Sequence, residues 1–304
     1  MKPQAFDPGL TTQFSGELRR TINRDGSFNV HRKGLRVRDA NLYLKLVDTT
    51  WTRFFMVALL AFLGANLIFA GVYLILGAEH LQGSDPEMSA FANAFFFSVH
   101  TLTTVGYGNI YPKGNGANLA SALEAASGLM FFALITGLLY GRFSRPSARI
   151  LFSDRALIAP YQDGTSLQFR LTNARDNVLM DLEARVLLMT VETSDGQLKR
   201  NYFELPLERR RVYFFPLTWT VVHPIDSESP LYGKTREDLA KSAAELLILM
   251  QGFDDTFSQV VHARYSYRHD EIVWGAKFLP AFSVDPQGDL ILDVDRVGEL
   301  RTIS

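Results

Sequence analysis

Five consecutive residues, Thr104, Val105, Gly106, Tyr107 and Gly108, could bind a cation through their backbone alone. The carbonyl oxygens of residues 104 to 107, with the Thr104 hydroxyl, can form stacked rings that replace the hydration shell of a potassium ion. Glycine at positions 106 and 108 permits backbone conformations that a Cβ atom would penalise, so successive carbonyls can turn toward one axis. Four copies of the chain are needed to complete each ring. The segment therefore predicts a K+ site in a homotetramer, with no organic cofactor.

The residues around this segment predict that it lies at membrane depth. The stretch from Phe91 to Pro112 is too apolar for an exposed loop and too short to cross a membrane and return as two helices. Irregular backbone is tolerated in a membrane only where protein buries it or where it lines a water-filled cavity. We therefore expect a re-entrant pore helix over 91–102 and a selectivity filter over 104–108.

Two apolar stretches flank the re-entrant segment. The sequence from Phe54 to Gly77 carries no charged residue and is long enough as a helix to span the roughly 30 Å hydrocarbon core. The second stretch, 118–142, is interrupted by Glu124 and is rich in Gly and Ala, which is typical of a helix packed among other helices. We predict an outer helix over 54–77 and an inner helix over 118–142.

The charges beside these stretches predict the orientation, because Lys and Arg accumulate on the cytoplasmic side of short loops. The connection between the spans carries acidic residues and a single lysine. Both termini are therefore expected in the cytoplasm. The basic residues that flank the spans are Arg32, Lys33, Arg36, Arg38, Lys45 and Arg53 before the first, and Arg142, Arg145 and Arg149 after the second.

The residues before the first span predict a cytoplasmic N-terminal arm over 1–40 and an amphipathic slide helix over 41–53. Leu42, Leu46 and Val47 recur at roughly helical spacing opposite Lys45, and Trp51 stands where a membrane interface is expected. The alternative is a soluble helix with an ordinary apolar stripe. The adjoining span favours a helix that lies at the membrane interface.

The remainder, 146–304, has the pattern of a β-sandwich. Short segments of alternating polarity are separated by Asp-Gly turns at 163–164 and 195–196, and we expect strands within 166–171, 183–189 and 212–222. Thr235 and Asp238 resemble a capping box and predict a short helix from Arg236 to about Ala243. An apolar strand over 245–250 follows it.

Composition excludes several classes of function. The chain has 304 residues, a formal charge of -1 and no cysteine, so neither a general nucleic-acid affinity nor thiol chemistry is expected. Its six histidines are scattered, and no nucleotide-binding or metalloprotease motif occurs. No nucleophile, base and orienting group can be named together, so the protein is not expected to be an enzyme.

Three further strings give the chain a resemblance to a known family. GRFSRP at 141–146, LTWTVVHPIDSESPLYG at 217–233 and ARYSYRHDEIVWGAKF at 263–278 are similar to the inward-rectifier potassium channel (Kir) family in its bacterial branch. The resemblance implies an α+β membrane protein. It would have two transmembrane helices within a pore domain over 54–145 and a cytoplasmic immunoglobulin-like β-sandwich. It further implies a homotetramer in the bacterial inner membrane, gated at the inner-helix bundle.

The same resemblance implies where the inner helix narrows the pore. Phe132 and Tyr140 match the family's constrictions, and Thr136 shares their face because the three recur every fourth residue. The alternative is that these aromatic rings only pack against neighbouring helices. Gly128 matches the family's hinge position, although a glycine in an Ala-rich membrane helix is often a close-packing site.

The chain departs from the family pattern at three positions. His100 stands where many members carry a Glu behind the filter, so the carboxylate interaction expected there is absent. Asn109 replaces the acidic residue often found just after the filter. Phe132 replaces the acidic cavity residue of strong rectifiers, so strong polyamine rectification is not expected.

Lipid regulation is predicted at the membrane-proximal cations Lys45, Arg142, Arg145 and Arg149, because such clusters attract anionic headgroups. The alternative is that these residues only satisfy the charge rule for orientation. For the whole chain, the second hypothesis is a membrane-anchored sensor whose β-sandwich binds a ligand while the pore does not conduct.

Overall fold

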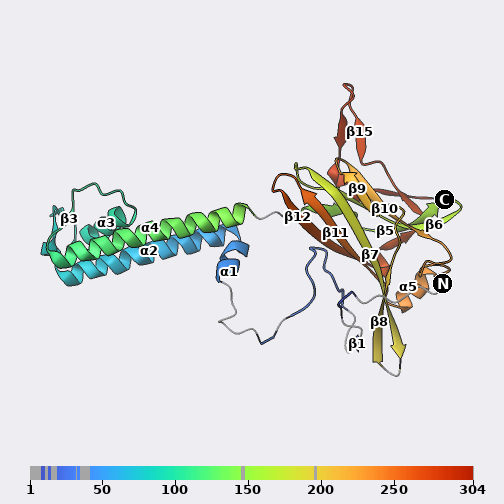
Figure 1. The fold of residues 1–304 in the computed structure, drawn as a ribbon, viewed down its shortest axis with the longest axis horizontal. Coiled ribbons are helices and arrows are strands. Elements are labelled where there is room, and N and C mark those ends of the chain that lie inside the picture. The colour runs from blue at the N-terminus through green and yellow to red at the C-terminus, as the bar shows by residue number, and fades with distance from the viewer. Residues whose placement is uncertain are drawn as a thin grey trace. The chain divides into compact units, whose positions relative to one another are not determined.

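The computed structural model describes residues 8–10, 13–14, 19–31, 33–34, 42–144, 148–194 and 197–303. The chain divides into two compact units, one made of 33–145 and the other of 1–32 together with 146–304. The first unit is helical and the second is built from strands (Figure 1). Each unit is described by itself below.

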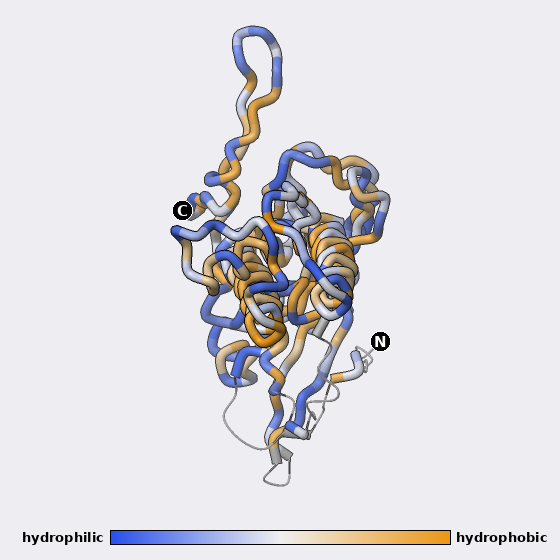
Figure 2. Tube along the Cα trace, turned by 90° about the vertical axis from the view of Figure 1, so that its left-hand side faces the viewer, coloured by the Kyte–Doolittle hydropathy of each residue, from blue (hydrophilic) through white to orange (hydrophobic). Residues whose placement is uncertain are grey.

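Two long helices form the frame of the helical unit. Helix α2 runs over Trp51–Leu76 and α4 over Asn115–Phe143, and both are long and apolar enough to cross a membrane. Most of their residues are hydrophobic (Figure 2), and many of their large hydrophobic side chains are exposed. A surface of this kind is stable only in lipid or against other protein. Helix α2 ends at Gly77, whose φ of 109° strongly favours glycine.

A short helix lies between them. Helix α3, Ala90–Leu102, begins with Ser89, whose hydroxyl accepts a hydrogen bond from the Ala92 amide. Its length of about 20 Å is too short to span a bilayer. The 3-10 helix η2 covers Ala78–His80. Strands β2, Leu81–Gln82, and β3, Tyr111–Pro112, pair in antiparallel fashion, so the chain returns to the end of α2 after α3.

The residues predicted as one slide helix over 41–53 form two helices. Helix α1 covers Leu42–Asp48, and α2 already begins at Trp51. Thr50 between them has an extended conformation, with φ -66° and ψ 154°. The carbonyl groups of Leu46, Val47 and Thr49 accept hydrogen bonds from the Arg142 side chain, which satisfies them where the helix stops.

The second unit is a sandwich of two sheets. One sheet has the strand order β1-β8-β7-β11-β12 with β9 on β7, and the other has β10-β6-β5-β13 with β4 on β6. The strands are β1 Gln13–Phe14, β4 Ile150–Phe152, β5 Ala156–Tyr161, β6 Gly164–Asn173, β7 Leu179–Ser194, β8 Gln197–Glu204, β9 Arg211–Phe214, β10 Thr218–Ile225, β11 Glu245–Asp254, β12 Gln259–Arg268 and β13 Ile272–Trp274. The remaining elements are α5 Arg236–Lys241, η3 His269–Glu271, β14 Ala276–Phe278, β15 Phe282–Val284, β16 Leu290–Leu292, η4 Val294–Gly298 and β17 Leu300–Thr302.

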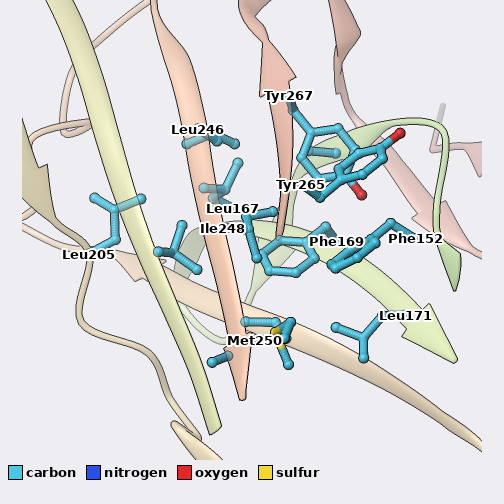
Figure 3. Close-up of a cluster of buried hydrophobic side chains, with 14 of the residues drawn as sticks. Phe152, Leu167, Phe169, Leu171, Leu205, Leu246, Ile248, Met250, Tyr265 and Tyr267 are labelled. Atoms are coloured by element: carbon cyan, nitrogen blue, oxygen red, sulfur yellow. The ribbon is translucent and has the colours of Figure 1, made fainter. Parts of the chain in front are cut away.

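The two sheets enclose one hydrophobic core (Figure 3). Leu246, Ile248 and Met250 alternate along β11 and point into it, as the period of two along a strand requires. Leu247, on the opposite face of β11, belongs to a second cluster that contains Ile22 of the N-terminal segment. The chain before the spans therefore covers the outer face of a sheet made by the chain after them.

The segment 212–222, expected as a single strand, is divided between the two sheets. Strand β9 pairs with β7, whereas β10 pairs with β6 in the other sheet. Pro216 stands between them and cannot donate a backbone hydrogen bond to a ladder. The predicted Thr235–Asp238 capping box is confirmed, and the helix it begins ends at Lys241.

Candidate functional site

The residues Thr104 to Gly108 lie one residue beyond the end of α3 and have an unusual backbone. Thr104, Gly106 and Gly108 have positive φ values of 61°, 54° and 78°, whereas Val105 and Tyr107 do not. Positive φ therefore occurs at every second residue of this segment. A positive φ is unusual for threonine, and such conformations cluster at functional sites. The backbone of residues 104–108 is therefore locally unusual in the way expected of a functional segment.

Helix α3 holds this backbone from one end. The Gly106 amide donates to the carbonyl of His100 at 3.1 Å, and the Thr104 amide donates to the carbonyl of Thr101 at 3.0 Å. The His100 ring packs edge-on against the Tyr107 ring, with the centroids 4.9 Å apart. Position 100 therefore has no carboxylate, and its imidazole ring makes an aromatic contact with Tyr107 instead.

In a single chain this segment is open. Val105, Tyr107 and the residues between them are exposed, and a Cβ built on Gly106 or Gly108 would meet no atom within 4 Å. Glycine is therefore required at these two positions by conformation and not by space.

Gly128 lies on the side of α4 that packs against α3. A Cβ at this position would stand 2.0 Å from the Leu102 carbonyl oxygen, at the end of α3. The glycine therefore allows α4 to pass directly beside the helix that supports residues 104–108. The predicted hinge at Gly128 stays a prediction, and the close-packing alternative has this geometric support.

Phe132, Thr136 and Tyr140 follow Gly128 along α4 at intervals of four residues. Phe131 packs against Phe62 of α2, with ring centroids 6.4 Å apart, and Phe132 is turned by about 100° from it. Phe132 and Tyr140 are both 73% exposed in the single chain, and Thr136 is exposed as well. The three side chains are free to meet other copies of the chain.

The four cations predicted to bind lipid differ in their surroundings. Arg142 is half-buried and donates to the carbonyls of Leu46, Val47 and Thr49 at 2.6, 2.9 and 2.7 Å. Its guanidinium carbon also lies 4.5 Å from the centre of the Trp51 ring. The side chains of Lys45 and Arg149 are exposed, and Arg145 lies outside the described residues.

The sequence did not indicate a cluster of charged residues that holds the N-terminal segment to the rest of the β-rich unit. Arg20 and Arg24 both donate to the Glu271 carboxylate, at 2.7 Å and 2.6 Å. Burial disfavours the charged carboxylate, but the Arg268 amide and the two arginines outweigh it and lower the pKa of Glu271. No pattern in the sequence joins positions 20 and 271, because their proximity depends on the sandwich.

Known protein families match both units of the chain. A family model for the inward rectifier potassium channel C-terminal domain matches residues 150–304, and one for an ion channel matches 61–145. The chain is 38% identical to the inward rectifier potassium channel Kirbac3.1 of Paramagnetospirillum magnetotacticum, over 99% of this chain and 98% of that one. The chain belongs to the inward rectifier potassium channel family. This inward rectifier is therefore an ion channel of the membrane and not an enzyme.

More distant relatives include the ATP-sensitive inward rectifier potassium channel 14 of Mus musculus and of Homo sapiens. Each is 26% identical over 86% of this chain, which spans 65% of the length of either relative. A solved structure of the sporulation control protein Spo0M from Bacillus subtilis matches 41% of this chain and 49% of its own at 10% identity, with a TM-score of 0.24. A similarity that low bears on neither fold nor function.

Proposed function

We propose that this inward rectifier conducts K+ through a tetrameric filter formed by the backbone of Thr104, Val105, Gly106 and Tyr107. The observation that carries the proposal is the alternating positive φ at Thr104, Gly106 and Gly108. The segment is exposed in a single chain, so four copies of it around a common axis could bring their carbonyl groups together and complete the oxygen rings that replace the hydration shell of K+.

The surroundings of the filter support a cation pathway. Helix α3 ends at Leu102, two residues before Thr104, and the C-terminal end of a helix carries partial negative charge. Four such ends converging below four filters would favour a cation there. The inner helix would then form the gate at Phe132, Thr136 and Tyr140, where four copies of each exposed ring narrow the pore and can exclude water.

The proposal extends to location and regulation. Both termini would be cytoplasmic, in the inner membrane of a bacterium, and exposed Lys45 and Arg149 would lie close enough to anionic headgroups to bind them. Arg142 differs from Lys45 and Arg149, because its guanidinium group already donates hydrogen bonds to three carbonyl groups. With Phe132 in the cavity, strong block by polyamines is not expected.

Flux through reconstituted tetramers tests the filter. Gly106→Ala should lose K+ over Na+ selectivity, because an L side chain at φ 54° costs roughly 1–2 kcal/mol in each of four chains. Gly64→Ala is the matched control, since Gly64 lies within α2 with ordinary helical φ and no atom near its Cβ. Selectivity that survives in Gly106→Ala contradicts the filter assignment. Absence of any K+ flux through the wild type would favour a membrane-anchored sensor.

A further inference from the structure

Four polar side chains meet in the middle of the membrane-spanning unit. Asn66 and Tyr73 come from α2, Ser98 from α3 and Glu124 from α4. Asn66, Ser98 and Glu124 have no exposed surface, and Tyr73 has 1%. An acidic residue buried at membrane depth is costly when charged and is retained for a purpose.

Among the described residues, no cation offsets a charge at this position. The groups that act on the Glu124 carboxyl are the hydroxyls of Tyr73 and Ser98, and no charged side chain of the described residues is among them. An ionised carboxylate there would be buried without a partner ion, which is strongly unfavourable.

The number of hydrogen atoms decides the state of the carboxyl. The Tyr73 hydroxyl lies 2.6 Å from Glu124 Oε2 and donates to it. The Ser98 hydroxyl lies within hydrogen-bond distance of both Glu124 Oε1 and Asn66 Oδ1, the latter at 3.0 Å. One hydroxyl carries one hydrogen and cannot donate to two oxygen atoms at once. A second hydrogen is therefore needed, and it has to come from Glu124 or Asn66.

Asn66 cannot supply that hydrogen. Its amide nitrogen donates to the Phe62 carbonyl at 2.8 Å, so its oxygen faces Ser98. Turning the amide over would place two carbonyl oxygens 2.8 Å apart with no hydrogen between them. The carboxyl group of Glu124 is the remaining source.

We propose that Glu124 is a neutral carboxylic acid whose proton completes a one-directional hydrogen-bond chain. Tyr73 donates to Glu124, Glu124 to Ser98, Ser98 to Asn66, and Asn66 to the Phe62 carbonyl. In this arrangement every polar group in the cluster is satisfied and no charge is buried. The chain joins α3 to both spanning helices without a salt bridge.

The cluster makes Glu124 a positioning residue for the filter, a role that rests on the proposed function. Ser98 is held by hydrogen bonds, and Leu102, one turn further along α3, is held by its close approach to Gly128. Between these two points lies His100, whose carbonyl receives the Gly106 amide. Loss of the chain should therefore loosen the support of the filter backbone.

Infrared spectroscopy of the reconstituted full-length tetramer tests the protonation state directly. The wild type should show the C=O stretching band of a protonated carboxyl at neutral pH, and Glu124→Gln should lack it. This readout does not depend on conduction, so it remains decisive even if the filter assignment fails. A spectrum in which Glu124→Gln removes carboxylate bands instead would overturn the proposal.

Substitution tests the positioning role. Glu124→Gln should keep the K+ to Na+ flux ratio within about twofold of the wild type, because its amide can donate to Ser98 and accept from Tyr73. Ser98→Ala should lower the ratio about fivefold, since it breaks the chain at α3. Ser127→Ala is the matched control, because within the described part of the chain that hydroxyl bonds only to the Leu123 carbonyl of its own helix. If Glu124→Gln is as harmful as Glu124→Ala, the neutral acid is refuted.

Discussion

At the scale of single residues, position 132 shows how little a side chain's type says without its direction. Phe131 and Phe132 are both phenylalanines in the same apolar helix, yet one packs against Phe62 and the other is exposed. In a monomer the exposed ring has no partner, and in a tetramer its place depends on where the common axis lies. Exposure alone does not distinguish a pore-lining face from a lipid-facing one, so substitution has to do so.

We expect Phe132→Ala to raise K+ flux, because removing four rings widens the narrow part of the pore. Phe132→Asp should in addition make outward current sensitive to internal spermine. Block should steepen with voltage, since moving one charge through the field is worth about 2.3 kcal/mol per 100 mV. Currents recorded across a voltage range with and without spermine give the measurement.

The control for this experiment is Leu134→Asp, which places the same charge at another exposed position of α4. Spermine block that appears equally in both variants, or in neither, would mean that residue 132 does not face the permeation path.

At the scale of elements, Arg142 connects the end of α4 with the junction of α1 and α2. Its three donor bonds satisfy carbonyls that the break between α1 and α2 leaves without helical partners. The planar guanidinium, with its several donors, suits this task, and a lysine ammonium does not reproduce its geometry. The same residue was predicted to bind lipid. Lipid binding requires its charge, whereas holding the junction requires the fixed arrangement of its donors.

Arg142→Lys separates these roles, because it keeps the charge and loses the fixed arrangement of donors. If Arg142 holds the junction, the lysine variant should lose roughly 1.5–3 kcal/mol of stability, the usual contribution of hydrogen bonds to a charged group. Thermal unfolding of the detergent-solubilised tetramer measures this. Arg149→Lys, at an exposed position, is the control and should change little.

A lipid role predicts the reverse pattern for flux. The response to anionic lipid would survive in Arg142→Lys and be lost in Arg142→Gln. Equal stability of Arg142→Lys and the wild type would show that the three carbonyl bonds contribute little.

At the scale of the whole molecule, the first and last parts of the chain fold together. Arg20 and Arg24 reach Glu271, and the amides of Thr21 and Ile22 approach the Glu245 carboxylate at 3.0 to 3.5 Å. Residues 19–28 therefore depend on two carboxylates contributed by the distant end of the chain. That dependence gives the segment a pH sensitivity with a defined sign.

Because the pKa of Glu271 is lowered in the folded state, its ion pairs contribute stability above its unfolded pKa of about 4.3. This contribution is lost as the pH falls below that value and through the folded pKa. We expect hydrogen exchange of residues 19–28, corrected for the intrinsic effect of pH, to rise in that range. Glu271→Gln should exchange faster already at neutral pH, whereas Glu228→Gln, at an exposed site, should behave as the wild type. Unchanged exchange in Glu271→Gln would contradict the anchoring role.

Much of the architecture followed from local sequence. The two spans, the short helix before residues 104–108 and the capped helix at Arg236 depend on hydrophobicity, on length and on neighbouring residues, which a sequence displays directly. The motif at Thr104–Gly108 is also local, because its chemistry lies in the backbone and its glycines mark the conformation. Local sequence was a less reliable guide to where a strand or helix ends. The strand expected over 212–222 is divided at Pro216, and the slide helix stops at Asp48.

Contacts between distant residues were decided by the tertiary structure alone. The sequence indicated that Glu124 lies inside the helical unit, but not that Tyr73, Ser98 and Asn66 surround it, because helix rotation and crossing decide which side chains meet. The same holds for the bonds of Arg142 to α1 and of Arg20 to Glu271. Hydrogen bonds and ion pairs act over a few ångströms, and only the folded chain brings such groups within that distance.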